Sequence, residues 1–437
     1  MHADSPPRAA LLRNPDFRWL TAGSALSMLG DQFTLIAMPW LVLQLTGSTR
    51  VLGTVLALIS VPRALFILFG GAVVDRHCPK RVLMYTKHAN TVLLGLLAAL
   101  VLSGPAALWA LYALALGIGL STAFSIPAAT SLTPRVVPRA QLQAANGIGM
   151  GLRQLSLFLG PLLAGVLIAA FGDDGDGGSS GSGGRAGTTG IGLAFAFDAL
   201  SYALSAWTLA RVRLLPPAPG QPAPGPQAGM VRAVWQGLRH FWADAELRAF
   251  LLYFAAVAVL IMGPVHIALP VLASSQPQLG AAAFGTMVGA HGAGTLAGMV
   301  ASGLLPRLRL GTLGATVLCI DLLIGLLFMP LGHATALWQG TLLMLAIGLL
   351  GGFMQVRVFT WIQQRVPPVL LGRAMGLFMF IFLGLAPLSA AVTGWVMHMV
   401  ALPWLFIGCG GTLMALAALA LLLSPMRHMQ DAAPQRP

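Results

Sequence analysis

The sequence predicts an all-α membrane protein with twelve transmembrane helices in two pseudo-symmetric bundles of six. Of its 437 residues, 57% are apolar and only 8% are charged, and the mean hydropathy is +0.82. Apolar stretches of membrane length recur along the chain, and its two halves share short sequences at nearly the same spacing. With 12 acidic residues, the chain lacks the carboxylates that a soluble surface of this size requires. A soluble enzyme is therefore excluded.

Stretches of about 20 apolar residues between polar or Gly/Pro breaks define the helices in order. The polar first 17 residues and the length of the first apolar stretch indicate a retained helix rather than a signal peptide. Polar loops, a Gly/Ser-rich outer loop and a proline-rich segment end successive stretches. The expected helices span residues 18–43, 50–74, 81–102, 106–129, 143–171, 190–210, 247–272, 281–305, 310–330, 335–357, 371–398 and 402–424.

The basic residues indicate that both termini are cytoplasmic. With this orientation only Arg50 and Arg185 fall in outer loops, and three arginines fall inside helices. Twenty of the 25 basic residues, Lys87 among them, are assigned to the inner side. This asymmetry follows the positive-inside rule. The net charge of +13 therefore reports topology rather than nucleic-acid binding.

The chain divides into two halves joined by a cytoplasmic linker. We expect an N-terminal segment, a six-helix bundle, a linker, a second bundle and a tail, over residues 1–17, 18–210, 211–246, 247–424 and 425–437. The linker opens with a proline-rich stretch. Its part from Val231 to Trp242 has apolar residues at helical spacing, as in a helix lying on the inner membrane face or a simple connector.

Short repeats relate the halves. Arg135-Val136-Val137-Pro138 matches Arg365-Val366-Pro367-Pro368 at an offset of 230, and Gly71 matches Gly303 at an offset of 232. Two repeats of six helices predict a binding site at mid-membrane, where the repeats meet.

Several motifs then resemble a known family. Gly71, Asp75, Arg76, Lys80 and Arg81 resemble the loop 2–3 signature of the major facilitator superfamily. Gly160, Pro161 and Gly165 are similar to the Gly-Pro motif of its antiporters, and residues 124–146 resemble the third drug:proton antiporter family, which includes macrolide, tetracycline and siderophore exporters. The resemblance implies a proton-coupled exporter that works by alternating access.

Ionisable residues inside a bilayer are candidates for function because burying a charge there is costly. At ~1.5 Å per residue, Asp31, Arg63, Arg153 and Asp198 fall in one mid-membrane layer of the first half, and their formal charges cancel. Asp321 and His291 fall at a similar depth in the second half. The alternative is that all six form satisfied ion pairs that hold helices together.

The resemblance separates these candidates. It implies that helices 1, 2, 4, 5, 7, 8, 10 and 11 line the central cavity, which makes Asp31 the favoured proton carrier. Asp198 and Asp321 then lie on outer helices and have structural roles. His291 either relays protons or contacts cargo, or it packs between helices. The resemblance also implies that the Asp75 loop contacts helix 11 and breaks this contact on opening, whereas a purely topogenic loop is the alternative.

Bulky apolar cargo would meet aromatic and methionine side chains on the cavity helices, although core or lipid-facing positions are the alternative for each. The candidates are Phe33, Met38, Phe124, Met262 and Phe353. Glycines 147, 149, 151, 285, 289, 294 and 298 are expected to provide small faces for close helix packing.

No cofactor and no metal site is expected. The outer loop from Asp173 to Gly178 begins like a calcium loop but lacks the later glutamate. No phosphate-binding GxxxxGK[ST] sequence occurs, which disfavours an ATP-driven pump. The three cysteines form neither a disulfide framework nor a metal cluster.

The sequence therefore predicts a monomeric multi-pass transporter of a bacterial inner membrane that exchanges a small amphiphilic compound for protons. A lipid or metabolite flippase or importer shares every motif. A membrane sensor or scaffold without transport is an alternative of another class, disfavoured because no sizeable soluble domain is present.

Overall fold

The computed structural model describes residues 11, 13–104, 107–138, 141–172, 188–215, 242, 244–276, 279–305, 308, 311–366, 378, 381 and 385–429. Within this part of the chain the secondary structure is helical, without strands. Twelve helical segments correspond to the twelve predicted spans, which confirms the predicted fold class. Ten of them are long and apolar enough to cross a membrane. The other two are α11 and α15.

The chain separates into two compact units. Unit 1 comprises Met1–Gly47 and Leu58–Gly225, and unit 2 comprises Ser48–Ala57 and Pro226–Pro437. The first turns of α3 therefore belong to unit 2, where Gly53 lies against Gly394 of α15. Because neither residue has a side chain, the two backbones approach closely.

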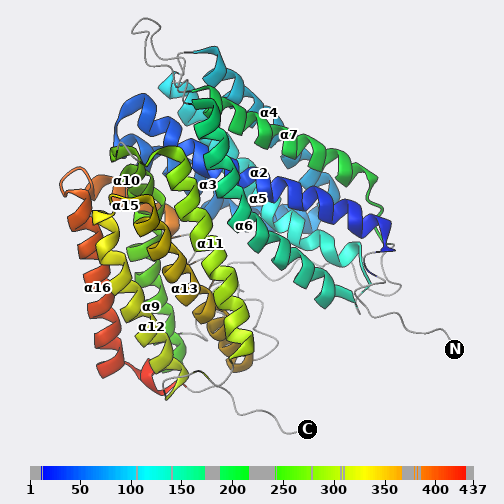
Figure 1. Ribbon diagram of the computed structural model, residues 1–437. Helices are drawn as coiled ribbons and strands as arrows, with labels where there is room; N and C mark the ends of the chain where they lie inside the picture. The colour runs from blue at the N-terminus through cyan, green and yellow to red at the C-terminus, as the bar shows by residue number, and fades with distance from the viewer. Residues whose placement is uncertain are drawn as a thin grey trace, which may run out of the picture. The chain divides into compact units, whose positions relative to one another are not determined.

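Unit 1 contains the first six helices, apart from the first turns of α3 (Figure 1). They are α2 (Pro15–Thr46), α3 (Thr49–Arg76), α4 (Pro79–Ser103), α5 (Leu108–Leu132), α6 (Leu142–Gly172) and α7 (Thr189–Arg211). Both α2 and α4 pack along α7, and α2 also packs on α6. A short 3-10 helix, η1 (Thr133–Arg135), follows α5, and the valines Val136 and Val137 after it are buried against Phe17 and Leu209.

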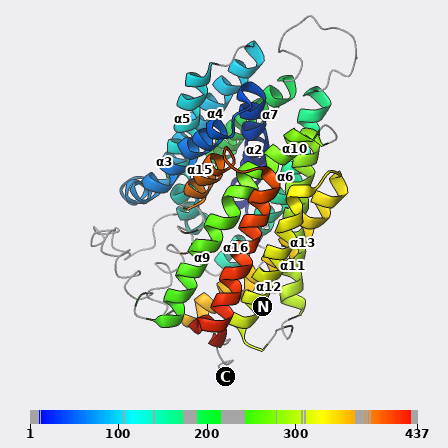
Figure 2. The same cartoon turned by 90° about the vertical axis from the view of Figure 1, so that its left-hand side faces the viewer.

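Unit 2 contains the other six segments, with α9, α12 and α16 side by side in both views (Figures 1 and 2). They are α9 (Ala245–Gly263) continued by α10 (Leu269–Ser275), α11 (Gly280–Leu304), α12 (Leu313–Phe328), α13 (Leu337–Arg365), α15 (Ala386–Val396) and α16 (Leu402–Leu423). Short helical turns η4 (Met329–His333) and η5 (Pro425–His428) follow α12 and α16.

A π-helical turn, η3 (Pro264–Ala268), links α9 to α10. The Ser389 hydroxyl of α15 accepts a hydrogen bond from the Gly263 N–H at 2.7 Å and donates one to the Val259 carbonyl. In a regular α-helix these two backbone groups bond to each other. The hydroxyl is thus inserted into the helical ladder, which accounts for the irregular turn beside it.

Glycines determine how closely α11 and α13 pack. A Cβ on Gly294 or Gly298 would overlap the α13 backbone, and one on Gly348 or Gly352 would overlap the α11 backbone. This confirms the predicted small face for Gly294 and Gly298. For Gly147, Gly149 and Gly151 of α6 the same expectation is wrong, because a Cβ at these positions meets open space.

The predicted linker helix and outer loop lie mostly outside the described residues. Trp242, the last residue of the predicted interfacial helix, is helical and half exposed.

Candidate functional site

A group of polar residues in unit 1 gathers where α2, α4 and α7 meet. Gly23 and Gly30 of α2 face α7, and a Cβ on either would overlap hydroxyl groups of Thr208 or Ser201. The missing side chains let α7 approach α2 closely enough for its hydroxyl and carboxyl groups to reach across. We call this region the polar seam. Its members are Ser27, Asp31, Thr34, Lys87, Asn90, Asp198, Ser201, Tyr202 and Ser205.

Asp31 lies at the accessible edge of the polar seam. Tyr202 of α7 donates a hydrogen bond from its hydroxyl to Asp31 Oδ1 at 2.7 Å. Tyr202 itself is 6% exposed, whereas Asp31 is solvent-exposed. A carboxylate halfway along a membrane-spanning helix is stable only beside water or partners. Asp31 therefore combines a fixed orientation with access for a proton.

Asp198 is the buried carboxylate of the polar seam, with 1% of its surface exposed. The Thr34 hydroxyl donates to its Oδ2, and the Ser201 hydroxyl lies 3.2 Å from its Oδ1. The Thr34 hydroxyl comes from α2 and the Ser201 hydroxyl from the next turn of α7. Asp198 is thus held by hydroxyl groups rather than by an ion pair, and its acidic group interacts electrostatically with Asp31.

Lys87 occupies a place that the sequence assigned wrongly. The sequence assigns it to the inner side as part of the topogenic charge, but it lies eight residues into α4, which begins at Pro79, and its side chain is only 6% exposed. Its ammonium donates to Ser205 Oγ at 2.6 Å and to Ser27 Oγ at 3.3 Å, and lies 5.5 Å from the centroid of the Tyr202 ring. Lys87 is thus a cation of this site that the sequence-based layer of four residues did not include.

Arg63 and Asn90 complete the surroundings of Asp31. Arg63 of α3 and Lys87 both interact electrostatically with Asp31. Arg63 is half-buried, and its Nε has no hydrogen-bond partner in the described part of the chain. Asn90 of α4 is fully buried beside Tyr202, with both amide atoms unpaired among the described residues.

Arg153 does not join this group. Gly160 of α6 packs over Gln32, the neighbour of Asp31 in sequence, and Arg153 comes two turns earlier on α6, about 10 Å along the helix axis. It is exposed. Of the four residues predicted in one layer, the structure therefore brings together Asp31, Arg63 and Asp198.

The predicted residues of the second half lie apart from one another. Asp321 of α12 is fully buried, and the Tyr253 hydroxyl of α9 donates to its Oδ2 at 2.7 Å. His291 of α11 is half-buried, and its carbonyl lies where α13 packs on α11 at Gly348. The pairing of Asp321 with Tyr253 was not predicted.

In the predicted gating loop, Gly71, Asp75 and Arg76 belong to the last turns of α3, and the side chains of Asp75 and Arg76 lie outside what the structure describes. Lys80 donates to the carbonyls of Ala210 at 3.1 Å and Val212 at 2.7 Å, where α7 ends. A lysine there compensates the partial negative charge of the helix C-terminus. Arg81 is exposed.

The antiporter motif is a packing feature in this conformation. Gly160 and Pro161 are buried, and a Cβ on Gly160 would overlap the Gln32 side chain. Gly165 is buried as well. Pro161 lies within α6, where its missing N–H is tolerated because neighbouring helices cover the bend.

The predicted cargo residues divide by burial. Phe33, Met38 and Phe353 are 5%, 1% and 7% exposed, so they present little surface to a ligand in this conformation. Phe33 packs on Phe197 with ring centroids 4.3 Å apart, whereas Phe124 and Met262 are half-buried.

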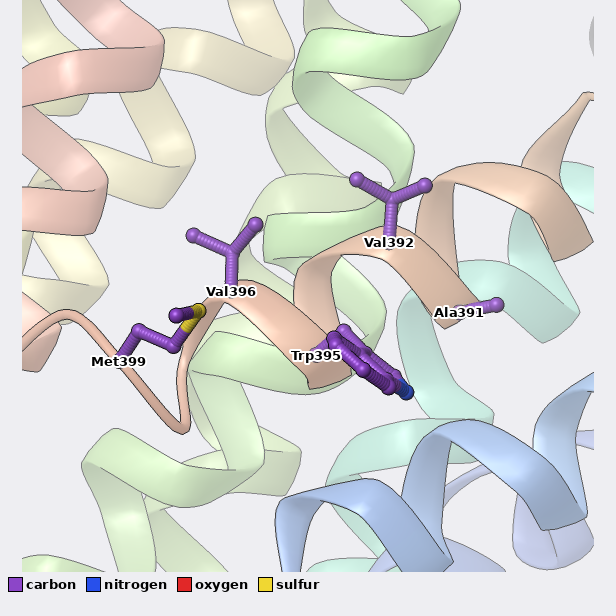
Figure 3. A pocket seen from close by; sticks show the side chains of 5 residues that line it. All are labelled: Ala391, Val392, Trp395, Val396 and Met399. Atoms are coloured by element: carbon purple, nitrogen blue, oxygen red, sulfur yellow. The ribbon is translucent and has the colours of Figure 1, made fainter.

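A shallow apolar hollow lies on α15 of unit 2 (Figure 3). Its lining consists of Ala391, Val392, Trp395, Val396 and Met399, without a polar side chain to orient a ligand except the indole N–H of Trp395. Lipid-facing helices present such surfaces, and the hollow does not resemble a cargo site.

An ion pair joins the start of α9 to the end of α13. Arg365 at the end of α13 lies 3.0 Å from Asp244 Oδ2 and 3.4 Å from Glu246 Oε2. Asp244 also caps α9 by accepting the N–H groups of Glu246 and Leu247. Partial burial opposes its ionisation, but the Leu247 N–H and the Arg365 guanidinium together hold the pKa of Asp244 below its usual value.

These features agree with comparison to known proteins. The model of the Major Facilitator Superfamily matches residues 20–388. The chain belongs to the Major Facilitator Superfamily. Among curated relatives it resembles enterobactin exporters: it is 26% identical to EntS of Escherichia coli over 379 residues, covering 84% of this chain and 82% of EntS. It is 26% identical to EntS of Salmonella typhi over 371 residues with the same coverage. The chain is thus a multi-pass membrane transporter of this superfamily.

Solved structures confirm the superfamily's fold. A nucleoside transporter NupG mutant aligns with a TM-score of 0.70 at 15% identity, covering 93% of this chain and 99% of that chain. An auto-inhibited POT family peptide transporter aligns with a TM-score of 0.71 at 13% identity, covering 97% and 98%. A bacterial homolog of the lysosomal transporter Spinster, inward-facing and unoccupied, aligns at 0.65 and 15% identity, covering 97% of both chains.

Proposed function

We propose that this chain is a proton-coupled exporter of a small amphiphilic compound, working by alternating access as a monomer in a bacterial inner membrane. The arrangement around Asp31 is the observation that carries the proposal. An accessible carboxylate midway along α2, held by the buried Tyr202 and influenced by two cations, can take up a proton and release it again. The loop signature and the Gly-Pro motif fit an antiporter.

The similarity to enterobactin exporters supports export and suggests a siderophore as the first cargo to test. Binding of the true cargo should raise the melting temperature of the purified protein, because a ligand that binds only the folded state stabilises it. A panel of siderophores, antibiotics and lysolipids, measured by thermal unfolding in detergent, would select the compound for transport assays.

The role of Asp31 is tested with Asp31→Asn in proteoliposomes under an imposed pH gradient. Asparagine keeps an acceptor for Tyr202 but cannot release a proton. We expect gradient-driven uphill movement of the selected cargo to be lost, while downhill exchange of labelled for unlabelled cargo continues. Cargo binding should also lose its dependence on pH.

Asp16→Asn is the matched control, since Asp16 lies on the same helix but in its first turn, where it accepts the backbone N–H of Arg213 at 2.7 Å. This variant should accumulate cargo like the wild type. Accumulation at the wild-type rate by Asp31→Asn would exclude Asp31 as the coupling site and direct attention to Asp198 and Asp321.

A further inference from the structure

We propose that Lys87 is the cation that sets the pH range over which Asp31 takes up its proton. This inference rests on the proposed function, in which Asp31 is the proton carrier. The sequence assigns Lys87 only to the inner side of the membrane and gives it no role in the site. Its place in the polar seam gives it one.

Lys87 is fixed to both helices that carry the proton site. Its ammonium donates to Ser27 Oγ on α2 and to Ser205 Oγ on α7. Ser27 precedes Asp31 by one turn, and Ser205 follows Tyr202 by about one turn, so the ammonium lies roughly 6 Å along the helix axis from the Asp31–Tyr202 pair. The Ser205 hydroxyl in turn donates to the Gly23 carbonyl at 2.6 Å, which fixes the position of this anchor.

Tyr202 contacts both Lys87 and Asp31. One end of its side chain donates to Asp31 Oδ1, while the ring faces the Lys87 ammonium. Among the described residues, Lys87 and Asp31 share Tyr202 as a contact instead of forming a direct ion pair. Lys87 favours the charged form of Asp31 without competing for the oxygen that must accept the proton.

A buried lysine with only a structural role would be expected to contact a carboxylate directly. Burying an ammonium is costly, and proteins usually compensate it with a carboxylate in direct contact. The hydrogen bonds of Lys87 go to two neutral hydroxyls, so its main electrostatic compensation is the charge on Asp31. Protonation of Asp31 removes that compensation, which couples the state of the carboxyl to α4.

The other charged and titratable groups around Asp31 come from two further elements. Arg63 of α3 is a second cation, and Tyr202 and Asp198 of α7 are the acidic neighbours. These groups are unchanged in a Lys87 variant, so a shift on substitution reports the Lys87 charge. Protonation itself adds one proton from water to an Asp31 carboxylate oxygen and breaks no other bond.

The test observes the proton on Asp31 directly and needs no cargo. The carbonyl stretch of protonated carboxyl groups is followed by infrared difference spectroscopy while the purified full-length protein is titrated with acid. Asp31→Asn assigns the Asp31 band, and Asp198→Asn and Asp321→Asn assign the other buried carboxyls. The midpoint of the Asp31 band is then compared between the wild type and Lys87 variants.

We expect Lys87→Met to move this midpoint to higher pH by about one unit or more, because a nearby cation disfavours protonation by about that much. Lys87→Arg keeps the charge and should return the midpoint close to the wild-type value. Methionine has a similar length and no charge to desolvate, so the variant should fold, which thermal unfolding checks. Arg50→Gln is the control, because Arg50 is also a cation on an aromatic ring, 5.7 Å from the Trp395 centroid, but belongs to unit 2.

An unchanged midpoint in Lys87→Met overturns the inference. An equal shift in Lys87→Arg also overturns it, because the shift would then follow from repacking rather than from charge. The inference is also overturned if the wild-type protein shows no Asp31 band whose intensity changes with pH. The proposed function is contradicted by a different result, namely uphill transport by Asp31→Asn in liposomes, so the two failures can be told apart.

Discussion

At the scale of single residues, the two units hold buried carboxyl groups in different ways. Asp31 and Asp198 share the polar seam with a lysine and several hydroxyls, whereas Asp321 has Tyr253 as its hydrogen-bond partner. The second oxygen of Asp321, Oδ1, is buried without a hydrogen-bond partner among the described residues. A carboxylate in that position would be costly. We therefore expect Asp321 to remain a neutral, structural acid.

This expectation predicts different effects for two substitutions. Asp321→Asn preserves shape, neutrality and the acceptor for Tyr253, so its melting temperature in detergent should stay close to that of the wild type. Asp321→Leu leaves the Tyr253 hydroxyl buried and unpaired, which costs about 1–3 kcal/mol. Adding Tyr253→Phe to Asp321→Leu should recover much of this loss. Equal destabilisation by both Asp321 variants would instead indicate that the negative charge itself is required.

The sequence located the carboxyl groups better than their partners. A count of residues along each helix placed Asp31 and Asp198 at the same depth, and the structure brings both into the polar seam. Lys87 was missed because a residue eight positions after the start of a helix can lie either near the membrane surface or within the membrane, and helix boundaries read from sequence are uncertain by several residues. Tyr202, Asn90 and Tyr253 carry no charge, so nothing in composition distinguished them from core residues. Which face of a helix meets its neighbour depends on tertiary packing, which the sequence alone does not specify.

At the scale of elements, glycine positions explain why α11 and α13 pack so closely. Gly294 and Gly298 lie four residues apart on α11, and Gly348 and Gly352 are spaced in the same way on α13. Each pair receives the backbone of the other helix. In a bilayer, water does not drive helices together, so close van der Waals packing of backbones is a main source of association.

Gly298 and Gly303 provide a matched pair of substitutions on α11. A Cβ on Gly298 would overlap the Leu349 carbonyl, whereas one on Gly303 meets open space. Gly298→Ala should therefore destabilise the protein by about 1–3 kcal/mol through overpacking. Gly303→Ala should leave stability unchanged or raise it slightly, since alanine favours the helix. Thermal or denaturant unfolding of both variants checks this, and similar values for the two would contradict the packing argument.

At the scale of the whole molecule, the internal repeat includes the N-terminal caps of the first helix of each half, α2 and α9. Asn14 caps α2 by accepting the N–H groups two and three residues later, and Asp244 caps α9 in the same way. The two caps are 230 positions apart, as are Asp16 and Glu246, and Arg135 and Arg365. Val136 and Val366 of the repeated motif are 2% and 3% exposed. The repeat therefore preserves a packed valine and a helix cap at corresponding places in both units.

The charge pattern predicts the membrane topology of the whole chain. Moving Lys87 into α4 lowers the count of inner basic residues from twenty to nineteen, against two in the outer loops. The asymmetry is unaffected, and the inner loops still follow the positive-inside rule. Residues Ser179 and Ser275 are therefore expected outside the membrane, and Ala218 in the cytoplasm.

Cysteine labelling in intact cells tests this orientation. The natural cysteines Cys78, Cys319 and Cys409 are partly accessible, so they are first replaced by serine or alanine. A single cysteine at Ser179 or Ser275 should then react with a membrane-impermeant maleimide added to intact spheroplasts, because both precede a helix that returns to the cytoplasm. One at Ala218 should react only after the membrane is permeabilised, which also shows that this cysteine is available for reaction. Labelling at Ala218 from outside, with protection at the other two positions, would invert the topology and require that the basic loops face outward despite their charge.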